Sequence, residues 1–241
     1  MAEGAVAQQH SEAKVHTPRA RSIREVVFGV NDGLVSITGI IVGVTSSHMS
    51  SHGIIIAGLA AVIAAAISMG LGQYLSTAAQ NEYFLAERQR EYREVQEIPH
   101  EERAEVEGIY RSQGFNAEEV QILTRRTTED PDRWVDFMMK EELGILMDAL
   151  DNPWSSSLVM AGAVVAGAVP PILPYLLIPH TSQAEVWAIV FAVVVAFGLG
   201  ALKAKVAKSS WWKSGTQFLL VTAAAVVVGI VGGNLLGHLF A

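Results

Sequence analysis

Carboxylate side chains recur at helical spacing between Glu82 and Asp151, a segment that holds 19 of the chain's 24 Asp and Glu residues. Only nine Lys and Arg residues oppose them, so the segment carries about ten net negative charges. Glu87, Glu91 and Glu94 stand at i, i+4 and i+7, on one face of a helix. Like charges at this spacing repel one another unless a cation lies among them. The pattern favours a cation-binding segment, with a solvated, charge-rich helical surface as the alternative.

A second acidic pair follows Pro99, which is expected to end the first helix of this segment. Glu102 and Glu105 are three residues apart, so they share one face of the next helix. A hairpin at Pro99 would bring this pair opposite Glu91 and Glu94. Carboxylates from two helices would then face one another, an arrangement that a divalent cation stabilises.

Two methionines join the pattern in the sequence FMMKEELG, where Met138 and Met139 precede Glu142 by four and three residues. Methionine usually fills hydrophobic cores. A thioether beside carboxylates nevertheless suits Fe²⁺ and other transition ions better than Ca²⁺ or Mg²⁺, which prefer oxygen ligands alone. The spacing therefore favours a site for a divalent transition-metal ion.

One carboxylate lies in an apolar segment, because Asp32 is the only charged residue in VVFGVNDGLVSITGIIVGV. Burying a charge in a membrane costs about 2.5–3.5 kcal/mol on insertion scales, so such a residue usually faces a water-filled path. The alternative is that the Asn-Asp-Gly sequence breaks the helix and Asp32 caps one half of it. Ser68, Met69 and Gln73, in the next apolar segment, are candidate ligands for an ion that passes Asp32.

Five stretches are long and apolar enough to cross a membrane as helices: about 26–46, 54–77, 156–178, 185–207 and 215–239. In lipid, backbone N–H and C=O groups must form hydrogen bonds within the protein, so these stretches are expected to be helices. We therefore expect an all-α fold, a five-span transmembrane bundle with a helical insert between spans two and three. The expected organisation is a polar N-terminal tail (1–24), spans one and two (25–79), the acidic insert (80–153) and spans three to five (154–241).

Helix signals divide the insert into three or four amphipathic helices. The first continues the second span to Ile98, and the second ends at Gly114. Asn116 is placed to cap a third helix, and Asp130 to open a fourth that runs through Leu146.

The basic residues predict the orientation. Four of them precede the first span, nine lie in the insert and four cluster at the turn between spans four and five. The positive-inside rule makes this side cytoplasmic. The chain shows no cleavable signal peptide. We expect an integral membrane protein with cytoplasmic N-terminus and insert, in a bacterial cytoplasmic membrane or, in a eukaryote, the vacuolar membrane.

Four histidines fall on the other side in this topology, namely His48, His52, His180 and His238. Histidine titrates near neutral pH, which would suit an exit relay for an ion. The alternative is that they are ordinary exposed loop residues.

Taken together, these blocks resemble the vacuolar iron transporter family in its full form with a cytoplasmic metal-binding domain. The matching sequences are REVVFGVNDGLVSITGIIVGV, AISMGLGQYLS, EYREVQEIPHEERAEVEGI, DPDRWVDFMMKEELG and VPPILPYLLIP. The resemblance implies a homodimer of five-span protomers that moves Fe²⁺, and often Mn²⁺, out of the cytoplasm in exchange for protons. It also implies metal ligands in the insert at Glu91, Glu94, Glu102, Glu105, Met138, Met139 and Glu142.

In the membrane, the resemblance places the transport pathway at Asp32 and Met69. One position departs from the family, whose characterised iron carriers have a Glu where this chain has Ala61. A second intramembrane carboxylate is therefore missing at that position.

The expected function is transport of Fe²⁺ or Mn²⁺ out of the cytoplasm by proton antiport, in metal homeostasis and detoxification. The alternative, which Ala61 favours, is a membrane-anchored metal sensor or buffer without transport. An enzyme is not expected, because di-iron bundles typically use ExxH motifs and His100 is at the wrong offset for one. The expected partners are the lipid bilayer, metal ions, protons and a second copy of the chain, with no prosthetic group and no nucleic acid.

Overall fold

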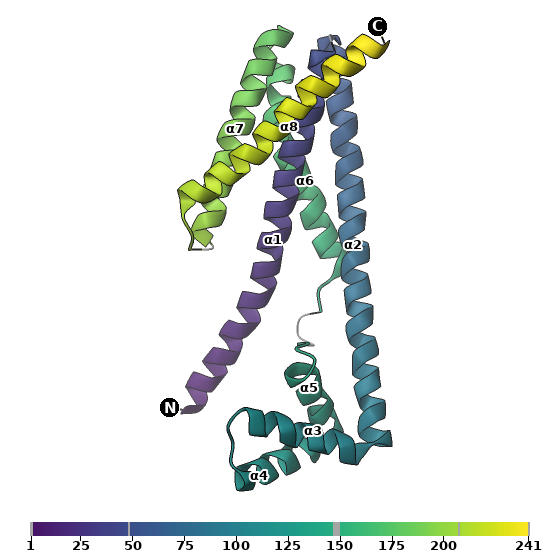
Figure 1. Ribbon diagram of the computed structural model, residues 1–241, viewed down its shortest axis with the longest axis vertical. Coiled ribbons are helices and arrows are strands. Elements are labelled where there is room, and N and C mark those ends of the chain that lie inside the picture. Colours follow the sequence, from purple (N-terminus) through teal and green to yellow (C-terminus); the bar gives the residue numbers. More distant parts are fainter. Residues whose placement is uncertain (1, 48, 147–149, 207, 241) are drawn as a thin grey trace. The chain divides into compact units, whose positions relative to one another are not determined.

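The computed structural model describes residues 2–47, 49–146, 150–206 and 208–240, with side chains from residue 23 onward except at 206 and 238–240. Its helices are α1 (Ala2–Ser46), α2 (Ser51–Glu97), α3 (Pro99–Ser112), α4 (Ala117–Thr128), α5 (Pro131–Glu141), α6 (Pro153–Leu177), α7 (Thr181–Val206) and α8 (Trp211–Phe240) (Figure 1). No strand occurs in these described residues, which confirms the all-α prediction.

The five predicted spans are confirmed as helices long and apolar enough to cross a membrane. They are Ile23–Ser46, the apolar half of α2, Pro153–Leu177, Thr181–Lys205 and Trp211–Gly237. Helix α2 has 47 residues, about twice what one crossing requires. The predicted continuity of the second span with the first insert helix is therefore correct.

The chain forms two compact units, each with its own core. The membrane unit consists of Arg19–Tyr74 and of the chain from Pro153 onward, and the insert unit includes Leu75–Asn152. The boundary between them falls within α2, where its apolar sequence gives way to a charged one.

Glycines in the membrane unit let α1 pack closely against two neighbours. A Cβ added at Gly33 would lie 2.1 Å from the carbonyl oxygen of Val164 on α6, and one at Gly233 on α8 would lie 2.0 Å from that of Gly43. Helix backbones can come this close only where the side chain is a hydrogen atom. The glycine repeat of the fifth span thus packs against α1 of the same chain.

Capping residues define the helices of the insert unit. The Asn116 side chain accepts hydrogen bonds from the backbone N–H groups of Glu118 and Glu119, and Asp130 accepts one from that of Arg133, so both predicted caps are confirmed. The prediction that the last helix continues through Leu146 is wrong, because α5 ends at Glu141. The physical reason is a C-terminal turn in which Gly144 has a φ of +68° and the Ile145 N–H bonds to the Met139 carbonyl.

Candidate functional site

Three helices of the insert unit contribute carboxylates to one cluster, as the sequence predicted. Glu91 and Glu94 lie in the polar half of α2, Glu102 and Glu105 lie on α3, and Glu142 caps the C-terminus of α5. The electrostatic interactions link the three elements, since Glu91 is repelled by Glu142 and Glu102 by Glu91. We call these residues the carboxylate cluster.

Burial and mutual repulsion make two of these groups hard to ionise. Glu91 is 1% exposed and Glu102 is 4% exposed. Burial, followed by the charges of Glu142 and Glu94, raises the pKa of Glu91 to about 7. Burial, followed by the charge of Glu105, raises the pKa of Glu102 to about 7 as well. Near neutral pH, a metal ion would therefore compete with protons for both groups.

An arginine holds part of the carboxylate cluster. The Arg90 guanidinium lies 3.0 Å from a carboxylate oxygen of Glu87, 3.5 Å from one of Glu91 and 3.4 Å from one of Glu94. The Glu91 Oε2 atom, by contrast, is buried and has no hydrogen-bond partner among the described residues. Such a group costs free energy, and a bound cation would remove that cost.

Met138 and Met139 are both fully buried, in a core that includes Val106, Trp134 and Val135. This packing accounts for their position without a ligand. In the part of the chain that the structure describes, no three Asp, Glu or His side chains are arranged to hold one metal ion. The carboxylates are gathered but do not converge on a point, so ion binding would require side-chain rearrangement, including movement of Arg90.

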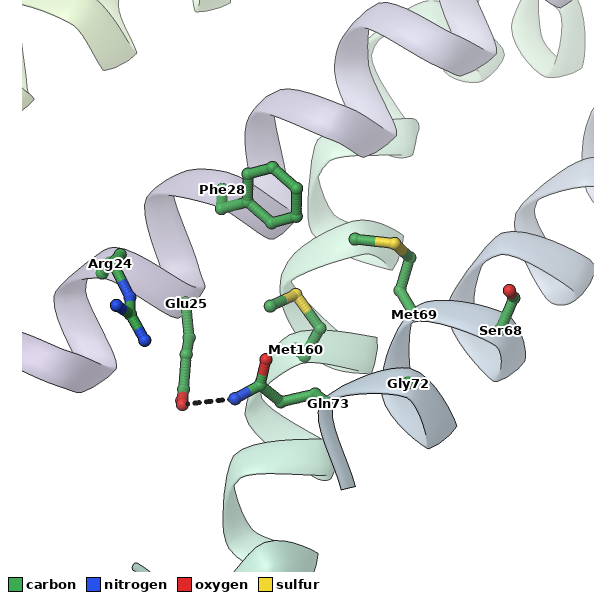
Figure 2. A pocket seen from close by; sticks show the side chains of 8 residues that line it. All are labelled: Arg24, Glu25, Phe28, Ser68, Met69, Gly72, Gln73 and Met160. Atoms are coloured by element: carbon green, nitrogen blue, oxygen red, sulfur yellow. Dashed lines mark hydrogen bonds between the residues drawn. The ribbon is translucent and has the colours of Figure 1, made fainter. Parts of the chain in front are cut away.

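The membrane unit has a cavity of about 410 Å³ at the end of the spans that contains Arg24 and Gln73. Figure 2 shows side chains from α1, α2 and α6 around it. Its lining residues are Arg24, Glu25, Phe28, Ser68, Met69, Gly72, Gln73 and Met160. Three of these, Ser68, Met69 and Gln73, were predicted from the sequence.

The carboxylate at this cavity is Glu25, which is not among the site residues predicted from the sequence. Glu25 is 4% exposed, and its Oε1 atom accepts a hydrogen bond of 3.0 Å from the Gln73 side-chain amide. A signal for it was available, since Glu25 precedes Asp32 by seven residues, two turns along the same helix face. This signal is weak because Glu25 lies at the polar end of the span, where charged residues are common.

Asp32 lies on α1, which is helical without a break from Ala2 to Ser46. The alternative in which Asn-Asp-Gly breaks the helix is therefore wrong. Asp32 is partly exposed and accepts a hydrogen bond of 3.3 Å from the Ser36 hydroxyl. It does not line the cavity around Met69, so the structure does not bring these two predicted pathway residues to one cavity.

Of the other positions singled out from the sequence, Ala61 is partly buried against the core that contains Ile37 and Ile41. His52 and His180 are exposed. His48 and the side chain of His238 lie outside the described residues.

Comparison with known proteins identifies the family. The family model described as the VIT family matches residues 23–234. The chain is 31% identical to vacuolar iron transporter 1 of Arabidopsis thaliana, over 92% of this chain and 89% of that protein. It is 32% identical to vacuolar iron transporter 1 of Eucalyptus grandis, over 90% and 86% respectively, and 33% identical to the vacuolar iron transporter of Toxoplasma gondii, over 89% and 74%. These matches cover both the spans and the insert. They show that the chain belongs to the VIT family.

Proposed function

We propose that this protein transports divalent transition-metal ions, Fe²⁺ or Mn²⁺, out of the cytoplasm in exchange for protons. The observation that carries the proposal is Asp32, a carboxylate retained within the apolar segment of α1. Membership of the VIT family supports it, because relatives of nearly the same length are named vacuolar iron transporters. Removal of excess metal from the cytoplasm would serve homeostasis and detoxification.

In the proposed mechanism, the carboxylate cluster captures the ion. The ligands are Glu91, Glu94, Glu102, Glu105 and Glu142, with Met138 and Met139 contributing where their thioethers can turn from the core. Capture releases protons, because carboxyl groups with a raised pKa must ionise to bind the metal. The insert would face the cytoplasm, as the distribution of basic residues favours.

The ion would then pass Met69 and Asp32 in the membrane unit of a homodimer. Protonation of Asp32 from the far side would remove its negative charge and release the ion. One carboxylate would thus carry metal in one direction and a proton in the other, which is the minimum that an exchanger requires.

The test is the flux of Fe²⁺ and Mn²⁺ into proteoliposomes of the full chain under an imposed pH gradient. We expect gradient-dependent flux in the wild type and its loss in Asp32→Asn, because asparagine has a similar shape but neither charge nor proton affinity. The Glu185→Gln variant is the control, since it removes a different carboxylate of the membrane unit, on α7 rather than on α1. Full flux in Asp32→Asn would contradict the mechanism.

A second candidate is a membrane-anchored metal sensor or buffer, and Ala61 is the observation that favours it. A chain that lacks one pathway carboxylate would bind metal in its insert without moving it. Metal binding by the wild type with no flux in either direction would support this function and exclude the transporter.

A further inference from the structure

We propose that the protein binds an anionic phospholipid in a second cavity of the membrane unit, between α1 and the α7–α8 pair, with the lipid phosphate held by Arg24 and Lys203. The inference goes beyond the proposed function, because it concerns a lipid partner and not the transported ion.

This cavity has a volume of about 390 Å³ and is lined by residues of three helices. Its apolar lining residues are Ile23, Val27 and Phe28 on α1 and Phe218 on α8. Its polar lining residues are Arg24 and Asn31 on α1 and Lys203 on α7. None of the described residues that line it is acidic. Apolar walls beside two positive charges suit a lipid that has an anionic headgroup.

The packing of α1 against α8 explains why a space opens here. The two helices run in the same direction and are closest where a Cβ added at Gly233 would lie 2.0 Å from the Gly43 carbonyl oxygen. Val27 precedes Gly43 by sixteen residues, and Phe218 precedes Gly233 by fifteen, so the cavity lies more than about 20 Å along each helix from this contact. Figure 1 shows that α1 and α8 separate toward this end. The space between them is filled by no helix and can admit a lipid from the side.

Two helices supply the positive charges. Arg24 and Lys203 are both exposed, so their charged ends can contact a ligand. The Lys203 ammonium lies 5.6 Å from the centre of the Phe218 ring, within the range of a cation–π contact. This contact keeps the ammonium at the cavity wall. A phosphate between the two side chains would accept charge-assisted hydrogen bonds from both.

The cavity lies at the depth of lipid headgroups. The first span begins at Ile23 and the fourth ends at Lys205, so Arg24 and Lys203 are one and two residues from the ends of their spans. At the same end, Trp211 and Trp212 are exposed and begin α8. Tryptophan is enriched where a span meets the headgroups. In the proposed orientation this end faces the cytoplasmic leaflet, which carries anionic lipids.

A phospholipid fits this cavity better than a free phosphate ion or a second copy of the chain. Phe28 is 55% exposed and Ile23 is 41% exposed, and an acyl chain would cover both, whereas a phosphate ion would cover neither. A two-fold contact of this face with itself would bring four positive charges into one interface. A single lipid satisfies the charges and the apolar wall together.

The experiment measures binding of dioleoyl phosphatidylglycerol to the full chain in detergent, by native mass spectrometry and by the rise in thermal midpoint. Phosphatidylcholine with the same acyl chains is the comparison, because its headgroup has no net charge. We expect phosphatidylglycerol to bind about tenfold more tightly, since two basic side chains face its phosphate. Equal affinity for the two lipids would overturn the proposal.

The variants Arg24→Gln and Lys203→Gln should each weaken phosphatidylglycerol binding about fivefold, the effect of one basic residue near an anionic headgroup. Lys203→Arg keeps the charge and should retain the affinity, which shows that the fold is intact. The matched control is Lys205→Gln, because Lys205 is an exposed residue on the same helix that does not line the cavity. Equal weakening in Lys203→Gln and Lys205→Gln would mean that lipid responds only to overall charge, and would overturn the site.

Two further outcomes would assign the cavity to another occupant and overturn the proposal. One is displacement of phosphatidylglycerol by inorganic phosphate beyond that by chloride at the same ionic strength, which would identify a site for a free anion. The other is a smaller dimer fraction in Arg24→Gln and Lys203→Gln at unchanged lipid affinity, which would identify a contact with a second copy. Because these measurements need no flux, they separate failure of the lipid site from failure of the transport function.

Discussion

At the scale of single residues, the proposed chemistry depends on carboxylates that are shielded from water. Glu91 and Glu102 in the insert unit and Glu25 in the membrane unit are each at most 4% exposed. Buried carboxylates persist where a proton, a hydrogen bond or a cation compensates for the charge. In the insert unit, protonation and the Arg90 guanidinium compensate for the charge of Glu91. In the membrane unit, the Gln73 amide donates a hydrogen bond to Glu25.

The raised pKa of Glu91 and Glu102, about 7, predicts that acid stabilises the metal-free protein. The folded state holds these protons more tightly than the unfolded state does, so the free energy of unfolding falls as pH rises from about 4.5 to about 7 and then levels off. With a chelator present, we expect the thermal midpoint to fall by several degrees between pH 5 and 8, since 1 kcal/mol corresponds to about 2–4 °C for a chain of this size.

The double variant Glu91→Gln, Glu102→Gln is the control for this prediction, because it keeps the side-chain shape and removes both titrations. Its midpoint should change little between pH 5 and 8, and added Mn²⁺ should stabilise it less than the wild type. The prediction fails if the variant and the wild type show the same pH profile.

Arg90 is predicted to compete with metal for the carboxylate cluster. The Arg90→Gln variant frees oxygens of Glu87, Glu91 and Glu94 and removes a positive charge that repels the ion. We expect Mn²⁺ to bind the full chain about tenfold more tightly, a change of about 1.4 kcal/mol. The metal-free protein should become less stable, because the repelling carboxylates lose their counter-charge.

Calorimetric titration with Mn²⁺ measures this effect, and Arg93→Gln is the matched control. It makes the same change in net charge on α2, but Arg93 is exposed and forms no ion pair with a described residue. Equal affinities for the two variants would mean that Arg90 acts only through the overall charge of the insert.

At the scale of helices, the close packing of α1 depends on glycine at particular positions. Gly233 and Gly232 are neighbours on α8 and provide a matched pair. A Cβ at Gly233 would meet the Gly43 carbonyl oxygen at 2.0 Å, whereas one at Gly232 would meet nothing within 4 Å. The small-residue pattern alone could not show which of the two faces α1.

Substitution of Gly233 by alanine should therefore destabilise the bundle, and the same substitution at Gly232 should not. Overpacking of this kind typically costs about 1–3 kcal/mol. We expect Gly233→Ala to lower the thermal midpoint in detergent by several degrees, and Gly232→Ala to leave it unchanged or slightly higher. Similar midpoints for both variants would mean that α8 does not pack against α1 through this face.

At the scale of the whole molecule, the proposed orientation places all 17 Lys and Arg residues on the cytoplasmic side. The chain contains no cysteine, so single cysteines can report the topology without background. Ser50→Cys, in the loop before α2, and Ser112→Cys, at the end of α3, both replace exposed residues.

A maleimide that cannot cross the membrane should label Ser50→Cys in intact cells, and Ser112→Cys only after the cells are permeabilised. The physical reason is that the Ser46–Gly53 loop carries no basic residue, whereas the insert carries nine. Labelling of Ser112→Cys in intact cells would reverse the orientation and with it the proposed direction of transport.

Much of the architecture follows from local patterns along the chain. The five apolar stretches, the caps at Asn116 and Asp130 and the end of α2 before Pro99 are each decided by neighbouring residues. The sequence prediction placed the end of α5 beyond its observed position, at Leu146 and not at Glu141. The apolar residues Leu143 and Leu146 continue the helical spacing past Gly144, where the chain in fact leaves the helix. The sequence did not decide whether Asn-Asp-Gly breaks the helix of the first span. The answer depends on how neighbouring helices pack against this segment, which its own sequence does not show.

What the sequence by itself determined is the helical fold, the spans and the acidic faces of single helices, because periodicity and charge spacing act within a few turns of one helix. Only the tertiary structure showed that carboxylates of α2, α3 and α5 lie close enough to repel one another, that Met138 and Met139 are buried in a core, and that Glu25 shares a cavity with Met69 and Met160. These facts depend on which face of each helix meets its neighbours. Contacts between α1, α2 and α6 join residues more than 40 positions apart in the chain, and no local pattern encodes that distance.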